Sequence, residues 1–115
     1  MPINVKYEGE VVILSNFARL MNDPRHVDAT RDVRELLEEG RREFVLDMRY
    51  LREIGDAGLG LLTTITRLIR KHDGEAVLAN VRKETMHFLD EMRLDAYWEI
   101  FDDEKEAVEY YKEIV

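Results

Sequence analysis

The sequence has no cysteine and only one serine, Ser15. Without cysteine, disulfide bonds, thiol catalysis and thiolate metal sites are excluded, and the serine does not lie in the Gly-x-Ser-x-Gly pattern of a nucleophile elbow. Long apolar runs are also missing, because stretches such as VVIL and LGLL are far shorter than the roughly 20 residues that span a bilayer. The N-terminal residues do not resemble a secretory signal. We therefore expect a cytoplasmic protein without membrane insertion.

Basic residues are in the minority as well. The chain has 17 Lys and Arg against 25 Asp and Glu, which gives a net charge of −8. Because nucleic acids and anionic membranes attract basic surfaces, we expect no nucleic-acid partner. A protein partner with a basic face is favoured instead. The 3 histidines are scattered without metal-ligand spacing, so we expect neither a metal nor a cofactor.

The chain does contain an alternation of strand-like and helix-like segments. Short apolar runs next to turn residues predict strands, and apolar residues at helical spacing predict helices. The predicted strands are 3–8, 11–17, 44–48, 76–79 and 97–101. The predicted helices are 27–40, the segment after Gly58 as far as His72, 82–92, and a last helix capped by Asp102 or Asp103, while 18–26 is predicted to be a loop.

This order predicts the fold class. Strands that alternate with helices indicate a mainly parallel sheet with right-handed crossovers, and the first two strands add an antiparallel hairpin that turns at Gly9. We therefore predict one α/β domain over residues 1–115, with the order β-β-α-β-α-β-α-β-α and about four α-helices around a mixed sheet. Four helices on so short a sheet are expected to leave one face partly open.

The segment EIGDAGLGLL, residues 53–62, is the most unusual stretch of the chain. Its spacing, Gly55-x-x-Gly58-x-Gly60, differs from the Rossmann pattern, and no Gly-Lys-Ser/Thr of a P-loop follows. A carboxylate at Asp56 would also repel a phosphate at the start of the next helix. The simplest structural interpretation is a tight connection from strand to helix, in which glycine supplies backbone freedom and Asp56 caps the helix.

Together with the preceding FVLDM at 44–48, this segment resembles the STAS domain of bacterial anti-sigma factor antagonists. That family has an apolar strand ending in Asp, followed by a segment close to Asp-Ser-Ser-Gly-Leu-Gly that opens a helix. The resemblance extends from about residue 3 to about residue 111. It implies a partner-switching protein, which binds an anti-sigma factor, usually a kinase-type protein, until phosphorylation of the first serine of the segment breaks the complex.

The resemblance also shows a departure, since Gly55, Asp56 and Ala57 stand where the family has its Asp and two serines. Asp56 therefore places one permanent charge where the family carries a switchable phosphoserine of about −1.5 to −2. Asp56 either prevents binding of a conventional kinase-type partner or suits a partner that accepts the carboxylate. The partner-binding residues implied by the resemblance are Ile54, Gly55, Asp56, Ala57, Gly58 and Leu59.

Other interpretations stay open at this point. The domain could be a STAS subunit of a larger assembly, such as a stressosome or a lipid-transport complex, and it could form a homo-oligomer. A small-ligand or nucleotide-binding domain is the rival from another class. An enzyme is not expected, because no nucleophile, paired acid or metal set accompanies Asp47 at its strand end.

Several polar side chains on the predicted helices are candidates for minor roles. Thr63, Thr64 and Thr85 are alternative phosphorylation sites, although solvent-facing helix residues are the favoured interpretation. The basic residues Arg67, Arg70 and Lys71 are interpreted as a solvated helix face, and Thr66 is placed away from the apolar stripe. The aromatic residues near the C-terminus are interpreted as core: Tyr97, Trp98, Phe101, Tyr110 and Tyr111.

Overall fold

The computed structural model describes residues 3–16, 26–51 and 54–113. In these ranges five strands and four helices follow one another in the predicted order, so the fold-class prediction is confirmed. The strands are β1 (Asn4–Glu8), β2 (Val11–Ser15), β3 (Glu43–Asp47), β4 (Glu75–Ala79) and β5 (Ile100–Phe101). The helices are α1 (His26–Glu38), α2 (Gly55–Lys71), α3 (Lys83–Glu91) and α4 (Glu104–Glu113). The predicted loop 18–26 lies outside the described residues, except for its last residue, which begins α1.

The strands form one sheet in the order β1-β2-β3-β4-β5. β1 and β2 are antiparallel, and their turn contains Gly9, whose positive φ of 61° explains the glycine. All the other neighbouring strands are parallel. The sheet is therefore mixed and mainly parallel, as the alternation of strands and helices predicted.

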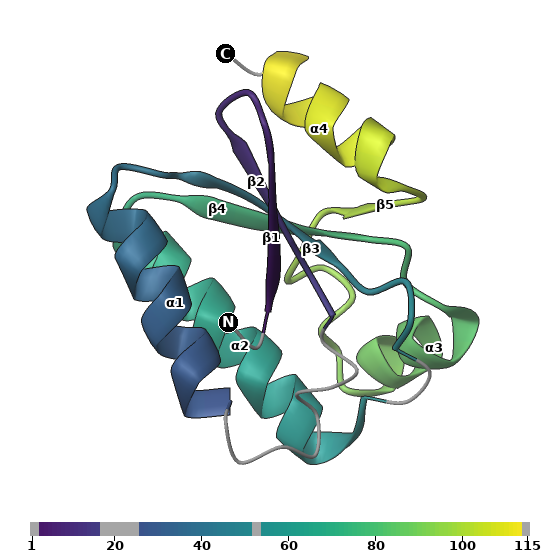
Figure 1. Ribbon diagram of the computed structural model, residues 1–115. Helices are drawn as coiled ribbons and strands as arrows, with labels where there is room; N and C mark the ends of the chain where they lie inside the picture. The colour runs from purple at the N-terminus through teal and green to yellow at the C-terminus, as the bar shows by residue number, and fades with distance from the viewer. Residues whose placement is uncertain (1–2, 17–25, 52–53, 114–115) are drawn as a thin grey trace.

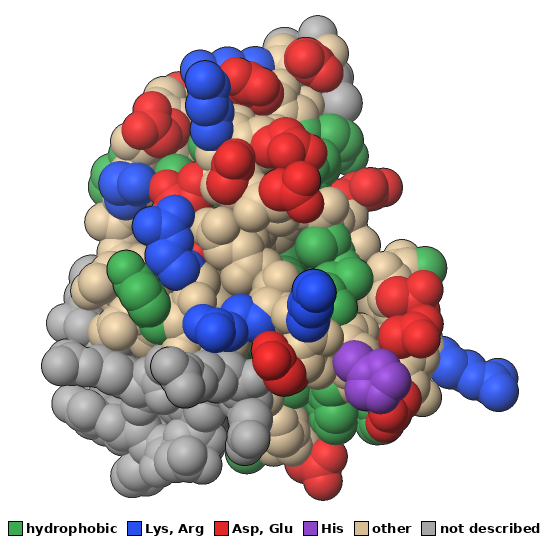
Figure 2. Space-filling model, turned by 90° about the vertical axis from the view of Figure 1, so that its right-hand side faces the viewer, with side chains coloured by type: hydrophobic (Ala, Val, Ile, Leu, Met, Phe, Trp, Pro, Cys, Tyr) green, Lys and Arg blue, Asp and Glu red, His purple; other side chains and the backbone are tan. Residues whose placement is uncertain are grey.

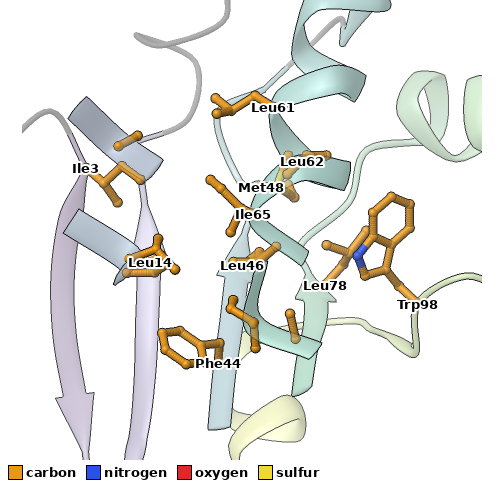
Figure 3. Packing of buried hydrophobic residues seen from close by; sticks show 14 of the residues in the cluster. Ile3, Leu14, Phe44, Leu46, Met48, Leu61, Leu62, Ile65, Leu78 and Trp98 are labelled. Carbon is orange, nitrogen blue, oxygen red and sulfur yellow. The ribbon is translucent and has the colours of Figure 1, made fainter. Parts of the chain in front are cut away.

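Helices cover the two faces of the sheet unequally. Figure 1 shows α1 and α2 side by side on one face and α4 on the other. The larger core lies under α1 and α2, where Phe44 and Leu46 of β3 pack with Leu62 and Ile65 of α2 (Figure 3). The alternate residue Val45 points to the opposite face and packs in a smaller core with α4. β3 is thus buried on both faces, which its continuous apolar sequence predicted.

Tyr111 attaches α4 to the middle of the sheet. Its ring is 1% exposed, and its hydroxyl donates hydrogen bonds to the carbonyl oxygens of Phe44 (2.8 Å) and Glu75 (3.0 Å). Burial raises the pKa of this phenol far above its usual value. At the start of the same helix, Asp103 Oδ1 accepts a hydrogen bond from the backbone N–H of Glu106 at 2.8 Å, so Asp103 is the predicted N-cap. Within the described residues, α4 alone covers this face of the sheet.

Two local predictions are wrong for the same reason. The last strand was predicted over 97–101, but only Ile100 and Phe101 pair with β4, because Trp98 turns into the larger core and donates from Nε1 to Thr66 Oγ1 at 2.9 Å. Thr66 is consequently fully buried and does not face solvent. The other aromatic predictions are confirmed, since the remaining four C-terminal rings are buried in or packed against the two cores.

Candidate protein-interaction site

The connection from β3 to α2 contains the segment that the sequence singled out. α2 begins at Gly55, earlier than the predicted start after Gly58. Gly55 has a positive φ of 59°, a conformation that strains residues with a Cβ, although the space around it is empty. Ile54 occupies the N-cap position and is only 4% exposed, so it anchors the start of the helix to the core. The glycine supplies the turn, and the isoleucine fixes where the turn ends.

Asp56 lies in the first turn of α2 and is exposed to solvent. The prediction that it caps the helix is wrong, because the N-cap position belongs to Ile54 and has no side-chain hydrogen bond. Asp56 is instead the second residue of the helix, and its exposed carboxylate lies near the positive end of the helix dipole. Such a charge is stabilised by about 0.3–1 kcal/mol at low ionic strength. The fold therefore tolerates a permanent negative charge at this position.

The six residues predicted to bind a partner divide into two kinds. Gly55, Asp56 and Ala57 are exposed and can touch another molecule directly. The other three are buried in the helix start and can only position the first three: Ile54, Gly58 and Leu59. Their role in partner binding stays a prediction.

Sequence reasoning missed Tyr50 on the same connection. It is 73% exposed, more than Tyr7 (47%) and Met92 (49%), which are also large exposed hydrophobic side chains. Exposed aromatic side chains are enriched at protein interfaces. The sequence could have pointed to Tyr50, because it is an aromatic residue between a buried strand and a glycine-rich turn and does not belong to the apolar spacing of either element.

The candidate phosphorylation sites on α2 and α3 differ in access. Thr64 is exposed, whereas the hydroxyl of Thr63 donates to the carbonyl oxygen of Leu59 at 3.0 Å. Thr85 is only 2% exposed, so the prediction that it faces solvent is wrong. Of these three threonines, Thr64 alone presents an exposed side chain.

Asp47 at the end of β3 has an acidic partner that the sequence did not reveal. It is 5% exposed, accepts hydrogen bonds from Arg49 N and Asn80 Nδ2 (both 3.0 Å), and shares a further hydrogen bond with the carboxyl of Glu104. Burial, and then the contact with Glu104, raise the pKa of Asp47. The same contact lowers the pKa of Glu104, whose Oε1 also lies 2.7 Å from Lys6 Nζ. This cluster joins the end of β3 to the start of α4.

The surface charge around α4 is mainly acidic. Figure 2 shows red side chains gathered over the upper part of the face that carries α4. Asp102, Asp103 and Glu106 around the start of this helix are exposed. An acidic face favours a partner with a basic surface, in agreement with the net charge of −8.

Comparisons with known proteins identify the fold family. Residues 25–107 match the model of the STAS domain. The chain belongs to the STAS domain family. The match includes the connection at 48–58, so the exposed Asp56 lies within the family's own architecture.

Solved structures share the fold of this STAS domain. A Thermotoga maritima protein named as an anti-sigma factor antagonist has a TM-score of 0.77 and 22% identity, over 94% of this chain and 92% of that chain. A Ser→Glu variant of RsbS from Moorella thermoacetica has a TM-score of 0.82 and 15% identity, over 99% and 97%. A chain of the stressosome has a TM-score of 0.80 and 16% identity, over 96% and 97%. No curated protein matches in sequence.

Two kinds of feature are absent from the described residues. No helix in these ranges is both long and apolar enough to cross a membrane. Over the same ranges, no group of three or more His, Cys, Asp or Glu side chains is arranged to hold a metal ion. The Asp47–Glu104 pair connects β3 with α4 and has Asn80 and Lys6 as its polar neighbours.

Proposed function

We propose that this STAS domain is a non-enzymatic protein-interaction module of bacterial signalling, similar to an anti-sigma factor antagonist, and that it docks its partner on the surface around Asp56. The observation that carries the proposal is the exposed carboxylate of Asp56 at the start of α2. The resemblance of the segment to the family pattern implies that this position corresponds to the phosphorylated serine. The expected partner is a kinase-type anti-sigma factor, and binding requires no cofactor.

The charge of Asp56 is the determinant of affinity in this proposal. A kinase-type partner that binds the unmodified serine form meets a permanent negative charge here, which weakens the complex. A partner that supplies Arg or Lys opposite the carboxylate gains a charge-assisted hydrogen bond. Both versions require affinity to change when the charge is removed, and they predict opposite signs.

The test compares the full chain with Asp56→Asn and Asp56→Ser. Proteins captured from lysate of the native host are identified, and the affinity of the purified partner is measured for each variant. A change of about 2 kcal/mol, roughly 30-fold in Kd, is expected if Asp56 is a central contact. Tighter binding supports the first version and weaker binding the second, while Asp56→Ser also shows whether the captured kinase phosphorylates a restored hydroxyl.

Glu84 offers a matched control. It is an exposed carboxylate in the first turn of α3, as Asp56 is in the first turn of α2. Glu84→Gln removes the same charge from an equivalent helix position and is expected to leave the affinity unchanged. Equal affinities for Asp56→Asn, Glu84→Gln and the unaltered chain would overturn the proposal that Asp56 lies at the docking surface.

A second candidate function is that of a subunit in a larger STAS assembly. The likeness to a stressosome chain supports it, with a TM-score of 0.80 over 96% of this chain. Sedimentation of the purified chain, and the identity of the captured proteins, distinguish the two functions. Homologous STAS subunits in a large particle favour the stressosome-like assembly, a transporter ATPase favours a lipid-transport complex, and a kinase-fold protein favours the antagonist.

A further inference from the structure

A groove runs between the two helices that cover the larger core. α1 and α2 lie side by side in Figure 1, and the hollow between them has a volume of about 350 Å³. Small-molecule sites usually measure about 300–1,000 Å³. The residues that line the groove come from both helices: Thr30, Arg34, Thr64, Arg67, Leu68 and Lys71.

The lining is almost entirely made of hydrogen-bond donors. Arg34 extends from α1, and Arg67 and Lys71 extend from α2, where a spacing of four residues places them on one helix face. The hydroxyls of Thr30 and Thr64 add polar groups on either side. Among the described residues that line the groove, one leucine is the only apolar side chain and none is a carboxylate. Three cations thus converge on one groove in a chain with a net charge of −8.

These cations are not used by the fold. Lys6, Arg70 and His87 form ion pairs with carboxylates, whereas no ion pair within the described residues is found for Arg34, Arg67 or Lys71. The sequence had placed Arg70 on the same basic face, but its guanidinium turns away. It contacts Glu75 Oε1 at 2.7 Å and the Tyr97 carbonyl oxygen at 2.7 Å. The interpretation as a solvated helix face is therefore wrong for Arg70, whereas Arg67 and Lys71 are exposed and line the groove.

We propose that the groove between α1 and α2 binds a phosphate-bearing anion. Guanidinium groups bind phosphate oxygens through paired hydrogen bonds, and a lysine ammonium adds a compact positive charge. Binding on this groove also removes the mutual repulsion of three unpaired cations. The site is separate from the interaction surface, because Thr64 lies eight residues after Asp56, about 12 Å along the helix axis.

Calorimetric titration of the full chain with inorganic pyrophosphate tests the proposal, at constant ionic strength and with sodium chloride as the reference salt. Saturable binding at one site is expected. Arg67→Gln is expected to weaken it at least tenfold, and Arg67→Lys, which keeps the charge without the paired donors, is expected to weaken it less. Arg34→Gln provides a second variant from the other helix. Circular dichroism of every variant verifies that it is folded.

Lys83→Gln is the matched control, since Lys83 is an exposed cation on α3. The Lys83→Gln and Asp56→Ser variants are both expected to bind pyrophosphate as tightly as the unaltered chain. An ATP titration separates the sources of the phosphate, because tighter binding than pyrophosphate indicates a nucleotide and equal binding indicates the phosphate alone. Absence of saturable binding, equal losses in Lys83→Gln and Arg67→Gln, or preference for an oligoglutamate peptide would overturn the proposal.

Discussion

The carboxyl pair of Asp47 and Glu104 predicts an unusual effect of pH on stability. Because the folded-state pKa of Asp47 is raised from 3.8, the folded protein holds this proton more tightly than the unfolded chain. Stability from this group is therefore lost as pH rises from about 3.8 through the folded-state pKa. Glu104 behaves oppositely, since its folded-state pKa is lowered from 4.5 and its contribution disappears only as pH falls through that lower value.

Asp47→Asn isolates the contribution of Asp47. The amide oxygen of an asparagine at this position can accept the hydrogen bonds from Arg49 N and Asn80 Nδ2, both 3.0 Å long in the present protein. Its NH₂ can donate to Glu104 at every pH, whereas the aspartic acid donates only while it is protonated. A hydrogen bond to a charged group contributes about 1.5–3 kcal/mol. The variant is therefore expected to be more stable by about 1–3 kcal/mol at pH 7 and nearly equal at pH 4.

Urea unfolding at both pH values measures this difference. Trp98 is the only tryptophan and is 3% exposed, so its fluorescence reports unfolding of the larger core. Asp95→Asn, at an exposed carboxylate, is the control and is expected to change stability by less than about 0.5 kcal/mol at either pH. A variant at Asp47 that is less stable at pH 7, or that gains equally at pH 4 and pH 7, would refute the reasoning.

Two further substitutions test the local geometry. Gly55→Ala should lower the free energy of unfolding by about 1–2 kcal/mol in urea, because φ is 59° and alanine avoids this region. Gly55→Asn should lower it less, since asparagine tolerates positive φ better. Equal stability of the unaltered chain and both variants would contradict the assigned turn. Thr66→Val should lower the free energy of unfolding by about 1–3 kcal/mol, since it leaves the buried Nε1–H of Trp98 without its 2.9 Å acceptor. Circular dichroism melts of Thr66→Val, Trp98→Phe and the double variant check this, and simple additivity would exclude the hydrogen bond.

The fold could be predicted from the sequence because its elements have strong local patterns. The apolar run from Phe44 to Leu46 and the stripe through Leu62 and Ile65 specify a buried strand and a helix without knowledge of their neighbours. The start of α2 was misplaced because glycine is a poor helix former. Burial of Ile54 and Gly58 overrides that local preference, and only the tertiary structure shows it.

The charged sites could be predicted only where one segment contains them. Asp56 and its glycine neighbours stand in one short stretch, so this candidate surface could be proposed from the sequence, and its role in binding stays a prediction. Asp47 and Glu104 come from a strand and a helix that are far apart in the sequence, and the groove cations come from two helices. No repeating pattern within one segment of the sequence links residues from different elements. Their proximity follows from the order of strands and the packing of α1 on α2, which the sequence pattern does not specify residue by residue.

The chemistry of the connection also restricts how this STAS domain can be regulated. Between Asp47 and Gly60 the only hydroxyl is the phenol of Tyr50, so serine phosphorylation cannot switch the charge at position 56. In the proposed function, regulation then acts on the partner or at another site of the domain. The groove cations are carried by the same helix as Asp56, but Arg67 lies eleven residues later, about 16 Å along the axis. This separation is twice the Debye length of about 8 Å at physiological salt. An anion bound in the proposed groove would therefore exert little direct repulsion on Asp56 at the proposed docking surface.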